Sequence, residues 1–386
     1  MMVIDIVHIY AGTAGNAGSY LNEIFVSLKD NFRQKIFVNY YYKYPSQDSI
    51  KIFYKYSELS SKYILIKNNI RLGIRFLELF FALTYIFVFI YLNKVKCVNY
   101  NLTSDLSIEY YFLKLIKKFK NIKILITCHD VLPFGTKNKK LLEAKIHNKK
   151  RFFDSADYLI IHNESSKIDL NKYYDIDDKI LFYPFPIMDL MHKSKNSSDK
   201  SNTIHNIQEN VIRFSMIGHF RIEKGLDLLI NAWQKFYNGR KKAELLIAGS
   251  FPDVQNYNLN PLKDKSVRII QSFLTDEQYL EIILKSHAII LPYKRGTNSG
   301  IPSSVITANT LVLASDIPMF RNNPLISDEF LFKSEDVESL VEKLDWLYNM
   351  SIQDREHYIR NNRMLCIKYR MTFRKYINDI YNFLLI

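Results

Sequence analysis

The chain has 386 residues, more than one hydrophobic core usually supports, and two domains are therefore expected. Apolar residues make up 48% and charged residues 24% of the sequence, which excludes an intrinsically disordered chain. With 11 glycines and 10 prolines, collagen-like and low-complexity classes are excluded as well, so regular secondary structure should dominate.

The formal net charge of +14 predicts attraction to a polyanion, such as nucleic acid, anionic lipid or a phosphorylated ligand. The lysines gather in two stretches, where they alternate with apolar residues at roughly helical spacing. Such stretches can lie on an anionic membrane, or they can be the solvated faces of ordinary helices, and both interpretations remain open here. The two stretches contain Lys114, Lys117, Lys118, Lys120 and Lys123, and then Lys137, Lys139, Lys140, Lys145, Lys149, Lys150 and Arg151.

Three cysteines, Cys97, Cys128 and Cys366, lie far apart in the sequence. Their spacing suggests neither a disulfide framework nor a thiolate metal site, and it is typical of a reducing compartment. The segment Met1–Tyr10 carries an aspartate inside an apolar, β-rich run and lacks the features of a secretory signal. We therefore expect the protein in the cytoplasm.

The first half of the chain alternates between β-rich and helical segments, which predicts a parallel, doubly wound, Rossmann-like sheet. The expected strands are Val3–Tyr10, Lys35–Tyr40, Val95–Asn101, Ile122–Cys128, Tyr158–His162 and Ile180–Tyr183. The expected helices are Ser19–Leu28, Phe76–Leu92, Ile108–Phe119, Leu141–Phe153 and Glu164–Tyr173.

The helix expected at Phe76–Leu92 is apolar nearly all round. It is slightly short for a bilayer span, and Glu78 and Thr84 also argue against one. Two interpretations remain: a helix buried between the sheet and its neighbours, or a helix that dips into a membrane interface. The β-like run Lys96–Asn101 follows directly and favours the buried crossover helix.

A polar segment, His192–Glu209, follows and is expected to be a linker, after which the alternation restarts. The predicted domains are residues 1–187 together with a C-terminal crossover helix at 370–386, and residues 188–369. The second domain is expected to hold strands at Ile212–Ile217, Ala243–Ala248, Val267–Ile270, Ala288–Leu291 and Val312–Ser315, and helices at Gly225–Tyr237, Asp276–Lys285, Ser303–Asn309, Val337–Asn349 and from Asp354 onward. Sheets of this kind bind ligands at the carboxyl ends of their strands, and a cleft between two of them is the expected site.

The segment Phe214–Ile230 carries the most informative motif. An apolar strand ends at Gly218, and a basic loop then leads through Gly225 into an amphipathic helix. The cations Arg221 and Lys224 would stand beside the amino terminus of that helix, where backbone amides attract anions, and this predicts a pyrophosphate site. A plain strand-loop-helix with surface cations is the alternative.

A second motif lies in Ala288–Asp316, where a buried strand runs into a loop rich in glycine and hydroxyl residues. The free amides and hydroxyls of this loop could hold phosphate or sugar oxygens. The residues that we expect to contribute are Asn298, Ser299, Gly300, Ser303 and Ser304.

These motifs resemble the donor-binding domain of the family 4 glycosyltransferases, which have the GT-B fold. The resemblance rests on the order G-x-x-R-x-x-K-G, an L-L-I-A-G strand, a D-E-Q-Y-L helix and L-P-Y…S-G…A-S-D-I-P. The first half is similar too, with the small-residue loop Gly12, Gly15 and Gly18, T-C-H-D at Thr127–Asp130, and Ser155–Ser166.

The chain departs from the family pattern at two points. His219 stands where most members have arginine, and Arg221 is expected to take that role. The paired glutamates of the family are absent, since Gly296 and Ser304 occupy their positions. A non-catalytic scaffold with this fold therefore remains an alternative.

The resemblance implies a retaining transfer from a nucleotide-sugar, with no metal and no other cofactor. Arg221 and Lys224 would stabilise the leaving diphosphate, and His129 would contact the donor sugar. Gly15, Gly218 and Phe273 join the loop residues named above as expected donor-binding residues, and Asp130 and Glu164 are placed on the acceptor side.

The expected acceptor is a glycan, carried on a polyprenyl diphosphate, in capsule, O-antigen or lipopolysaccharide assembly. The enzyme would be peripherally bound to the inner face of the plasma membrane, whose anionic surface is an expected partner. A nucleic-acid-binding protein is a further alternative, which would explain the positive charge and the aromatic content of 14%. For the enzyme, nucleic acid is not expected as a partner, because the aromatic residues lie mostly in apolar periodic stretches. A sugar-nucleotide epimerase is less favoured, since no convincing pair of acid and base carboxylates is evident.

Overall fold

The computed structural model describes residues 2–12, 17–44, 46–58, 68–102, 107–129, 131, 139–188, 211–238, 242–251, 266–296 and 299–385. The chain divides into two compact units. Unit 1 is Met1–Pro186 together with Met371–Ile386, and unit 2 is Ile187–Arg370. Each unit is described separately below.

Unit 1 is built on a parallel sheet of seven strands in the order β3-β2-β1-β4-β5-β6-β7. The chain runs outward to one edge and then restarts on the other side of β1, which is the doubly wound pattern. The strands are β1 Val3–Tyr10, β2 Gln34–Asn39, β3 Ser49–Phe53, β4 Lys94–Leu102, β5 Lys123–Thr127, β6 Tyr158–Ile161 and β7 Ile180–Phe182.

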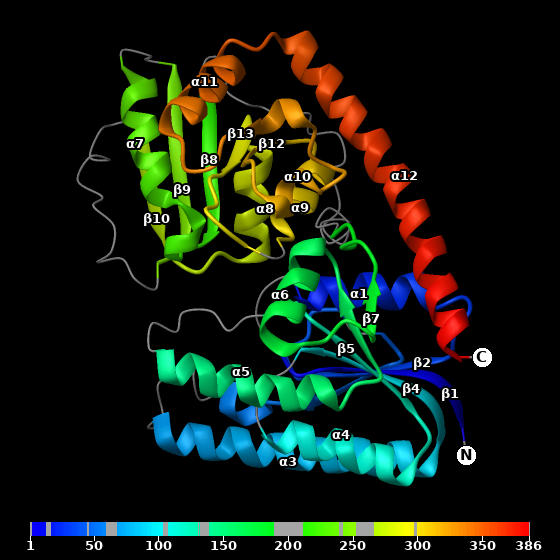
Figure 1. The fold of residues 1–386 in the computed structure, drawn as a ribbon. Coiled ribbons are helices and arrows are strands. Elements are labelled where there is room, and N and C mark those ends of the chain that lie inside the picture. The colour runs from blue at the N-terminus through cyan, green and yellow to red at the C-terminus, as the bar shows by residue number, and fades with distance from the viewer. Residues whose placement is uncertain are drawn as a thin grey trace. The chain divides into compact units, whose positions relative to one another are not determined.

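Helices cover both faces of this sheet (Figure 1). On one face, Val7 and Ile9 of β1 belong to the core that α3, α4 and α5 complete. On the other face, Tyr10 packs with Leu21 of α1. The helices are α1 Ala17–Leu28, α3 Asn68–Leu92, α4 Ser107–Phe119, α5 Lys139–Asp154 and α6 Glu164–Tyr174.

The last turns of α12 (Ile352–Leu385) also belong to unit 1. Tyr381 is fully buried, and its hydroxyl accepts a hydrogen bond of 2.8 Å from the side-chain amide of Asn99 in β4. Asn378 donates to the carbonyl oxygen of Ser27, at the end of α1, over 2.9 Å. The C-terminal residues therefore complete the α1 face of the sheet.

Unit 2 is built on a parallel sheet of six strands in the order β10-β9-β8-β11-β12-β13. This is the order 3-2-1-4-5-6 of a dinucleotide-type Rossmann sheet. The strands are β8 Ile212–His219, β9 Ala243–Ser250, β10 Val267–Gln271, β11 Ala288–Leu291, β12 Leu311–Ser315 and β13 Leu331–Phe332. The helices are the 3₁₀ turns η2 Ile222–Lys224 and η5 Asp328–Phe330, and α7 Leu226–Tyr237, α8 Asp276–Leu284, α9 Ile301–Thr307, α10 Pro318–Arg321 and α11 Val337–Tyr348.

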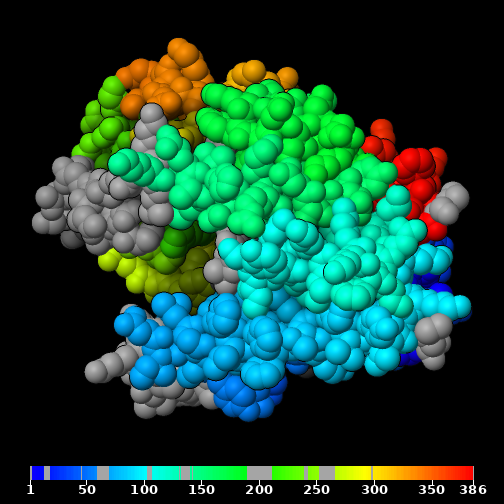
Figure 2. Space-filling model, turned by 60° about the horizontal axis from the view of Figure 1, so that its bottom comes forward, coloured from blue at the N-terminus to red at the C-terminus, as the bar shows by residue number. Residues whose placement is uncertain are grey.

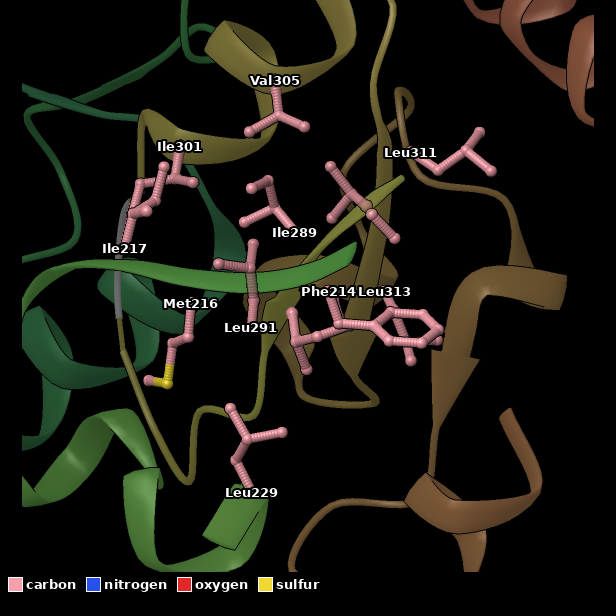
Figure 3. Packing of buried hydrophobic residues seen from close by; sticks show 14 of the residues in the cluster. Phe214, Met216, Ile217, Leu229, Ile289, Leu291, Ile301, Val305, Leu311 and Leu313 are labelled. Carbon is pink, nitrogen blue, oxygen red and sulfur yellow. The ribbon is translucent and has the colours of Figure 1, made fainter. Parts of the chain in front are cut away.

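The core of unit 2 lies on both sides of β8 and β11 (Figure 3). Leu229 of α7 approaches the sheet from one side and Val305 of α9 from the other, while Phe214 and Ile289 lie in the sheet between them. All four side chains are fully buried. This packing fixes where the loops after β8 and β11 leave the sheet.

The predicted fold class, two doubly wound Rossmann-like sheets, is confirmed. Five short elements were not predicted: β3, η2, α10, η5 and β13. Helix α9 begins two residues earlier than expected and ends two residues earlier, at Thr307. The run Lys96–Asn101 lies in β4, so the preceding helix is a crossover as expected.

The favoured interpretation of the apolar helix holds for only one of its faces. Helix α3 begins at Asn68 rather than Phe76, and Leu83 and Ile86 are buried against the sheet, whereas Phe81 and Val88 are exposed. Among the described residues, this is the one helix long and apolar enough to cross a membrane, over Asn69–Leu92.

Candidate active site

The two sequence motifs of unit 2 meet at the point where the strand order reverses. β8 and β11 are neighbours, but the sheet grows away from them in opposite directions. Ligands of doubly wound sheets bind outside the carboxyl ends of the strands at such a point. The loops that follow β8 and β11 are tied together there, because the amide of Lys294 donates to the carbonyl oxygen of Glu223 over 2.9 Å.

Three glycines let the backbones of this region approach one another closely. Gly218, Gly225 and Gly249 all have positive φ, at 130°, 67° and 152°. A Cβ atom on Gly249 would lie 1.7 Å from the carbonyl oxygen of Gly218, and one on Gly225 would lie 1.8 Å from that of Pro292. No other residue type fits at Gly225 or Gly249 without moving the backbone.

Two predicted cations stand between the end of β8 and the start of α7. Arg221 precedes the 3₁₀ turn η2, and its Nε atom is buried. Lys224 ends that turn, and its Nζ atom lies 3.7 Å from the centre of the Tyr293 ring. The cations therefore adjoin the positive end of the twelve-residue helix α7, as the sequence predicted.

Two more cations lie beside them, and neither was predicted from the sequence. Lys294 contacts Asp227 over 2.6 Å, and Arg295 contacts Glu223 over 3.1 Å. Burial raises the pKa of Glu223, but its backbone hydrogen bond and Arg295 outweigh burial and lower it overall. Glu223 thus stays ionised and holds Arg295 near the loop. The signal was P-Y-K-R after β11, which lies inside the second motif but before the loop residues that were expected to contribute.

The serines of the second loop are engaged within the chain. The hydroxyl groups of Ser303 and Ser304 are buried and lie 3.0 and 3.1 Å from the carbonyl oxygen of Gly300, to which they donate. A phosphate oxygen also needs a donor, so in this conformation neither hydroxyl can donate to one. Ser299 differs, because its Oγ accepts from the amide of Ile301 over 3.4 Å and keeps its proton for another acceptor.

Phe273 follows β10, the outermost strand on the β9 side of the sheet. Its ring is 76% exposed, an unusual state for a large aromatic side chain. Such a ring can stack on a nucleobase. Its proposed role in donor binding remains a prediction.

In unit 1, His129 follows β5 and packs against an aromatic side chain. Its ring centre lies 4.6 Å from that of Tyr20 in an edge-to-face arrangement, and its Nε2 atom is buried. Burial lowers the pKa of His129 to about 4, against a smaller upward effect from the backbone of Asn101. The imidazole is therefore neutral at neutral pH, so it can hydrogen-bond a sugar hydroxyl but does not act as a standing cation.

A second histidine lies next to it and was not assigned from the sequence. The ring centres of His162 and His129 are 6.0 Å apart, and Nδ1 of His162 donates to the carbonyl oxygen of Tyr183 over 2.9 Å. Burial lowers the pKa of His162 to about 3. The hydroxyl groups of Tyr20 and Tyr183 are 2.8 Å apart, so these four rings form one buried network.

The predicted acceptor-side residue Glu164 is in the first turn of α6. The preceding Asn163 caps this helix by accepting from the amide of Ser166 over 2.8 Å. A carboxylate in the first turn stabilises the start of a helix. This role explains Glu164 without any contact with an acceptor substrate. The remaining predicted site residues, Gly15, Asp130 and Asn298, lie outside the described residues.

Within the part of the chain that the structure describes, no group of three His, Cys, Asp or Glu side chains is placed to hold a metal ion.

Two family models match the chain. Residues 197–364 match "Glycosyl transferases group 1", and residues 98–185 match "Glucosyltransferase 3-like, N-terminal domain". No curated protein matches the sequence.

Solved structures match over nearly the whole chain. A sucrose-phosphate synthase from Thermosynechococcus elongatus is similar at a TM-score of 0.65 and 14% identity, over 98% of this chain and 99% of the other. A trehalose-6-phosphate synthase is similar at 0.65 and 13%, over 98% of each chain. The Anabaena protein HepE, in complex with UDP and glucose, is similar at 0.65 and 11%, over 98% and 99%. At such identities the likeness establishes the fold, which is GT-B.

The class of protein that the fold and the family models define is therefore a glycosyltransferase. The segment that matches the group 1 model lies mostly in unit 2 and contains the glycine turns and the cations described above.

Proposed function

We propose that this enzyme transfers a sugar from a nucleotide-sugar donor, with retention of configuration and without a metal ion. The observation that carries the proposal is the pair of cations, Arg221 and Lys224, at the switch point of a group 1 glycosyltransferase domain. As the bond to the sugar breaks, negative charge grows on the leaving diphosphate. Fixed cations and loop amides at that place stabilise this charge, which is the task that Mg²⁺ performs elsewhere.

Retention is compatible with the side chains of the site. If the acceptor attacks from the face that the diphosphate leaves, the leaving phosphate can accept the acceptor's proton. No second carboxylate is then required. Neutral His129 would hydrogen-bond the donor sugar.

We infer that UDP-glucose is the first donor to test. One matched family model is named for a glucosyltransferase, and HepE was solved with UDP and glucose. Phe273 offers an exposed ring for the uracil base, and Ser299 keeps a hydroxyl proton for a phosphate oxygen.

The acceptor that we propose is a lipid-linked glycan in cell-surface polysaccharide synthesis, at the inner face of the plasma membrane. The net charge of +14 and the lysine stretches support an anionic surface as partner. A second candidate acceptor is a soluble sugar phosphate, because two similar structures are a sucrose-phosphate synthase and a trehalose-6-phosphate synthase. Both acceptors are anionic, and the charge does not separate them.

The donor is tested by a thermal-shift and hydrolysis screen of the purified chain with UDP-, GDP-, CMP- and dTDP-sugars, each with and without EDTA. We expect stabilisation by UDP-sugars that EDTA leaves unchanged. No shift with any nucleotide-sugar would contradict the donor site and favour the scaffold alternative. Product formation with polyprenyl-diphosphate-linked glycans or with sugar phosphates then distinguishes the two acceptors.

The cation site is tested by replacing Arg221 or Lys224 with alanine. We expect turnover to fall about 100-fold in each variant, the usual loss when one charge-stabilising group is removed. Lys235→Ala is the matched control, because Lys235 lies in the last turn of the same helix α7 and pairs with Glu338. Near-normal turnover in both test variants would remove the proposed phosphate site.

A further inference from the structure

Helix α3 leaves one apolar face in solvent. Leu79, Leu83 and Ile86 are buried against the sheet, while a second stripe on the opposite side is exposed. A surface helix of a globular protein normally carries charged residues on that side, yet the sequence from 79 to 92 contains no Asp, Glu, Lys, Arg or His. We call this stripe the α3 outer face; its residues are Leu77, Phe80, Phe81, Tyr85, Val88 and Tyr91, each between 46% and 66% exposed.

Two polar side chains beside this face, Thr84 and Glu78, make hydrogen bonds within the protein. The hydroxyl of Thr84 donates to the carbonyl oxygen of Phe80, one turn earlier, over 2.8 Å. The carboxylate of Glu78 accepts from the backbone amides of Tyr56 and Ser57, at 2.7 and 3.1 Å. Neither group then needs water. This is how a helix accommodates polar side chains beside an apolar medium.

Helix α4 extends the apolar surface. It packs beside α3, with the ring centres of Phe87 and Phe119 6.1 Å apart, and Figure 2 shows the two helices adjacent on one face of unit 1. Tyr111, Leu115 and Phe119 follow one another at intervals of four residues and are 58%, 41% and 52% exposed. The exposed apolar surface therefore spans two helices.

Cations line this surface, and the described residues of α3 and α4 present no exposed carboxylate. Lys114 and Lys118 are exposed on α4, and Nζ of Lys120 lies 5.1 Å from the centre of the Tyr91 ring. The only carboxylate in the α4 sequence, Glu109, is buried and accepts from the hydroxyl of Tyr100 over 2.7 Å. Aromatic residues mixed with lysines, without exposed carboxylates, are complementary to an anionic lipid surface.

Not every lysine of the predicted stretches is available for this. Lys117 pairs with Asp157 over 2.9 Å, and Lys149 is buried. Lys150 donates to the carbonyl oxygen of Tyr174, and Arg151 stacks on the ring of Tyr110. Of the cations in the two stretches, Lys114, Lys118 and Lys120 adjoin the apolar surface of α3 and α4.

We propose that α3 lies in the plane of an anionic bilayer, with the α3 outer face and the apolar stripe of α4 among the lipid chains and Lys114, Lys118 and Lys120 at the level of the phosphates. The inference rests on the proposed peripheral membrane location and names the surface responsible. It excludes a spanning orientation, because Leu83 and Ile86 hold the other side of α3 in the core of unit 1. An in-plane helix of this kind sinks about 5–10 Å into the bilayer.

The apolar part is tested by sedimentation of the full-length chain with vesicles of phosphatidylglycerol and phosphatidylcholine. We expect Phe81→Asp with Val88→Asp to lower the vesicle partition coefficient at least ten-fold. The matched control is Ile168→Asp with Phe383→Asp, at two apolar positions of unit 1 that are 64% and 70% exposed; this variant should bind as the parent does. Unchanged binding in the first variant, or equal loss in both, overturns the proposal.

The charged part is tested by Lys114→Glu with Lys118→Glu, a variant that leaves the apolar stripe intact. We expect at least a ten-fold loss on anionic vesicles, and less difference from the parent at high salt. Lys235→Glu with Lys285→Glu, at exposed positions of unit 2, is the control. A loss in the control that equals the loss in the test variant means that net charge alone attracts the chain, and overturns the assigned surface.

Depth and occupancy are tested with Phe81→Trp and brominated lipids. We expect quenching of this tryptophan from shallow bromine positions, with no quenching in the Phe383→Trp control.

A dimer in vesicle-free solution that Phe81→Asp with Val88→Asp dissociates would identify the face as a contact between copies and overturn the proposal. None of these assays needs a donor or acceptor. Donor hydrolysis by the variants therefore reports on the transferase proposal separately.

Discussion

At the scale of single residues, two glycines hold the switch point of unit 2 together. Gly249 faces the carbonyl oxygen of Gly218 from the neighbouring strand, and Gly225 faces that of Pro292. A side chain at either position would push apart two backbone segments that otherwise lie in contact. The same contacts place Arg221 and Lys224, so these glycines determine the geometry of the proposed phosphate site as well as local stability.

Gly249→Ala should destabilise unit 2 by about 3 kcal/mol, because the new methyl group meets backbone at 1.7 Å and φ is 152°. Gly73→Ala is the matched control. It lies exposed in α3 with no atom within 4 Å of its Cβ position, and should stabilise by up to about 1 kcal/mol. Urea denaturation measures both. Equal free energies of unfolding for the parent and Gly249→Ala would contradict the packing described.

The buried histidines of unit 1 should make its stability depend on pH. Burial lowers the pKa of His129 to about 4 and that of His162 to about 3, from 6.5. Below pH 6.5 these two imidazoles bind protons in the unfolded chain but stay neutral in the folded chain. The free energy of unfolding therefore falls as pH drops from about 6.5 toward 4. Each histidine contributes up to about 1.4 kcal/mol per pH unit.

Denaturation series at several pH values between 7.5 and 4.5 measure this slope. His162→Gln should flatten it, while His357→Gln, at an exposed position of α12, is the control. A parent chain whose unfolding free energy is constant from pH 7 to pH 5 would show that these imidazoles are not buried as described.

At the scale of elements, the last turns of α12 serve as part of the unit 1 fold rather than as a tail. Tyr381→Ala should destabilise unit 1 by about 3–5 kcal/mol, since it removes a fully buried ring and the hydrogen bond with Asn99. Phe383→Ala, two positions away and 70% exposed, should change stability by no more than about 0.5 kcal/mol. Limited proteolysis and chemical denaturation compare the stability of unit 1 in the two variants. An equal loss of stability in both would contradict the packing of α12 against unit 1.

Elements with a strong apolar period were predictable, and those without one were not. β1 and β8 match their predicted bounds closely because apolar residues predominate in both strands. β3 has one fully buried residue, Phe53, and β13 is two residues long, so neither presents a period to recognise. The two faces of α3 could not be told apart either, because both are apolar and only tertiary contacts decide which is covered.

The site was predictable where a local rule applied. The G-x-x-R-x-x-K-G loop indicated Gly218, Arg221 and Lys224 because a glycine turn and cations next to a helix start are recognisable in one segment. The positions of His162 and Tyr20 beside His129 depend on the pairing of β5 with β6 and on the packing of α1 against the sheet. The internal hydrogen bonds of Ser303 and Ser304 likewise appear only when α9 is built.

At the scale of the whole molecule, the chain divides its tasks between two units that each have a complete core. The cations and glycine turns of the proposed donor site all belong to unit 2. The buried histidine network and the proposed lipid-facing helices all belong to unit 1. Because each unit is stabilised mainly by its own packing, a ligand held by one unit should stabilise that unit more than the other.

Binding of the nucleoside diphosphate alone should therefore protect unit 2 selectively against hydrogen exchange. At 100 times its dissociation constant, a ligand adds about 2.7 kcal/mol to the stability of the unit that holds it. Amides of β8 and β11, which exchange through unfolding of unit 2, should then slow about 100-fold. Amides of β1 and β4 serve as the internal control and should change little. Protection that appears mainly in β1 and β4 would place the nucleotide on unit 1 and contradict the assignment of Arg221 and Lys224 to the leaving diphosphate.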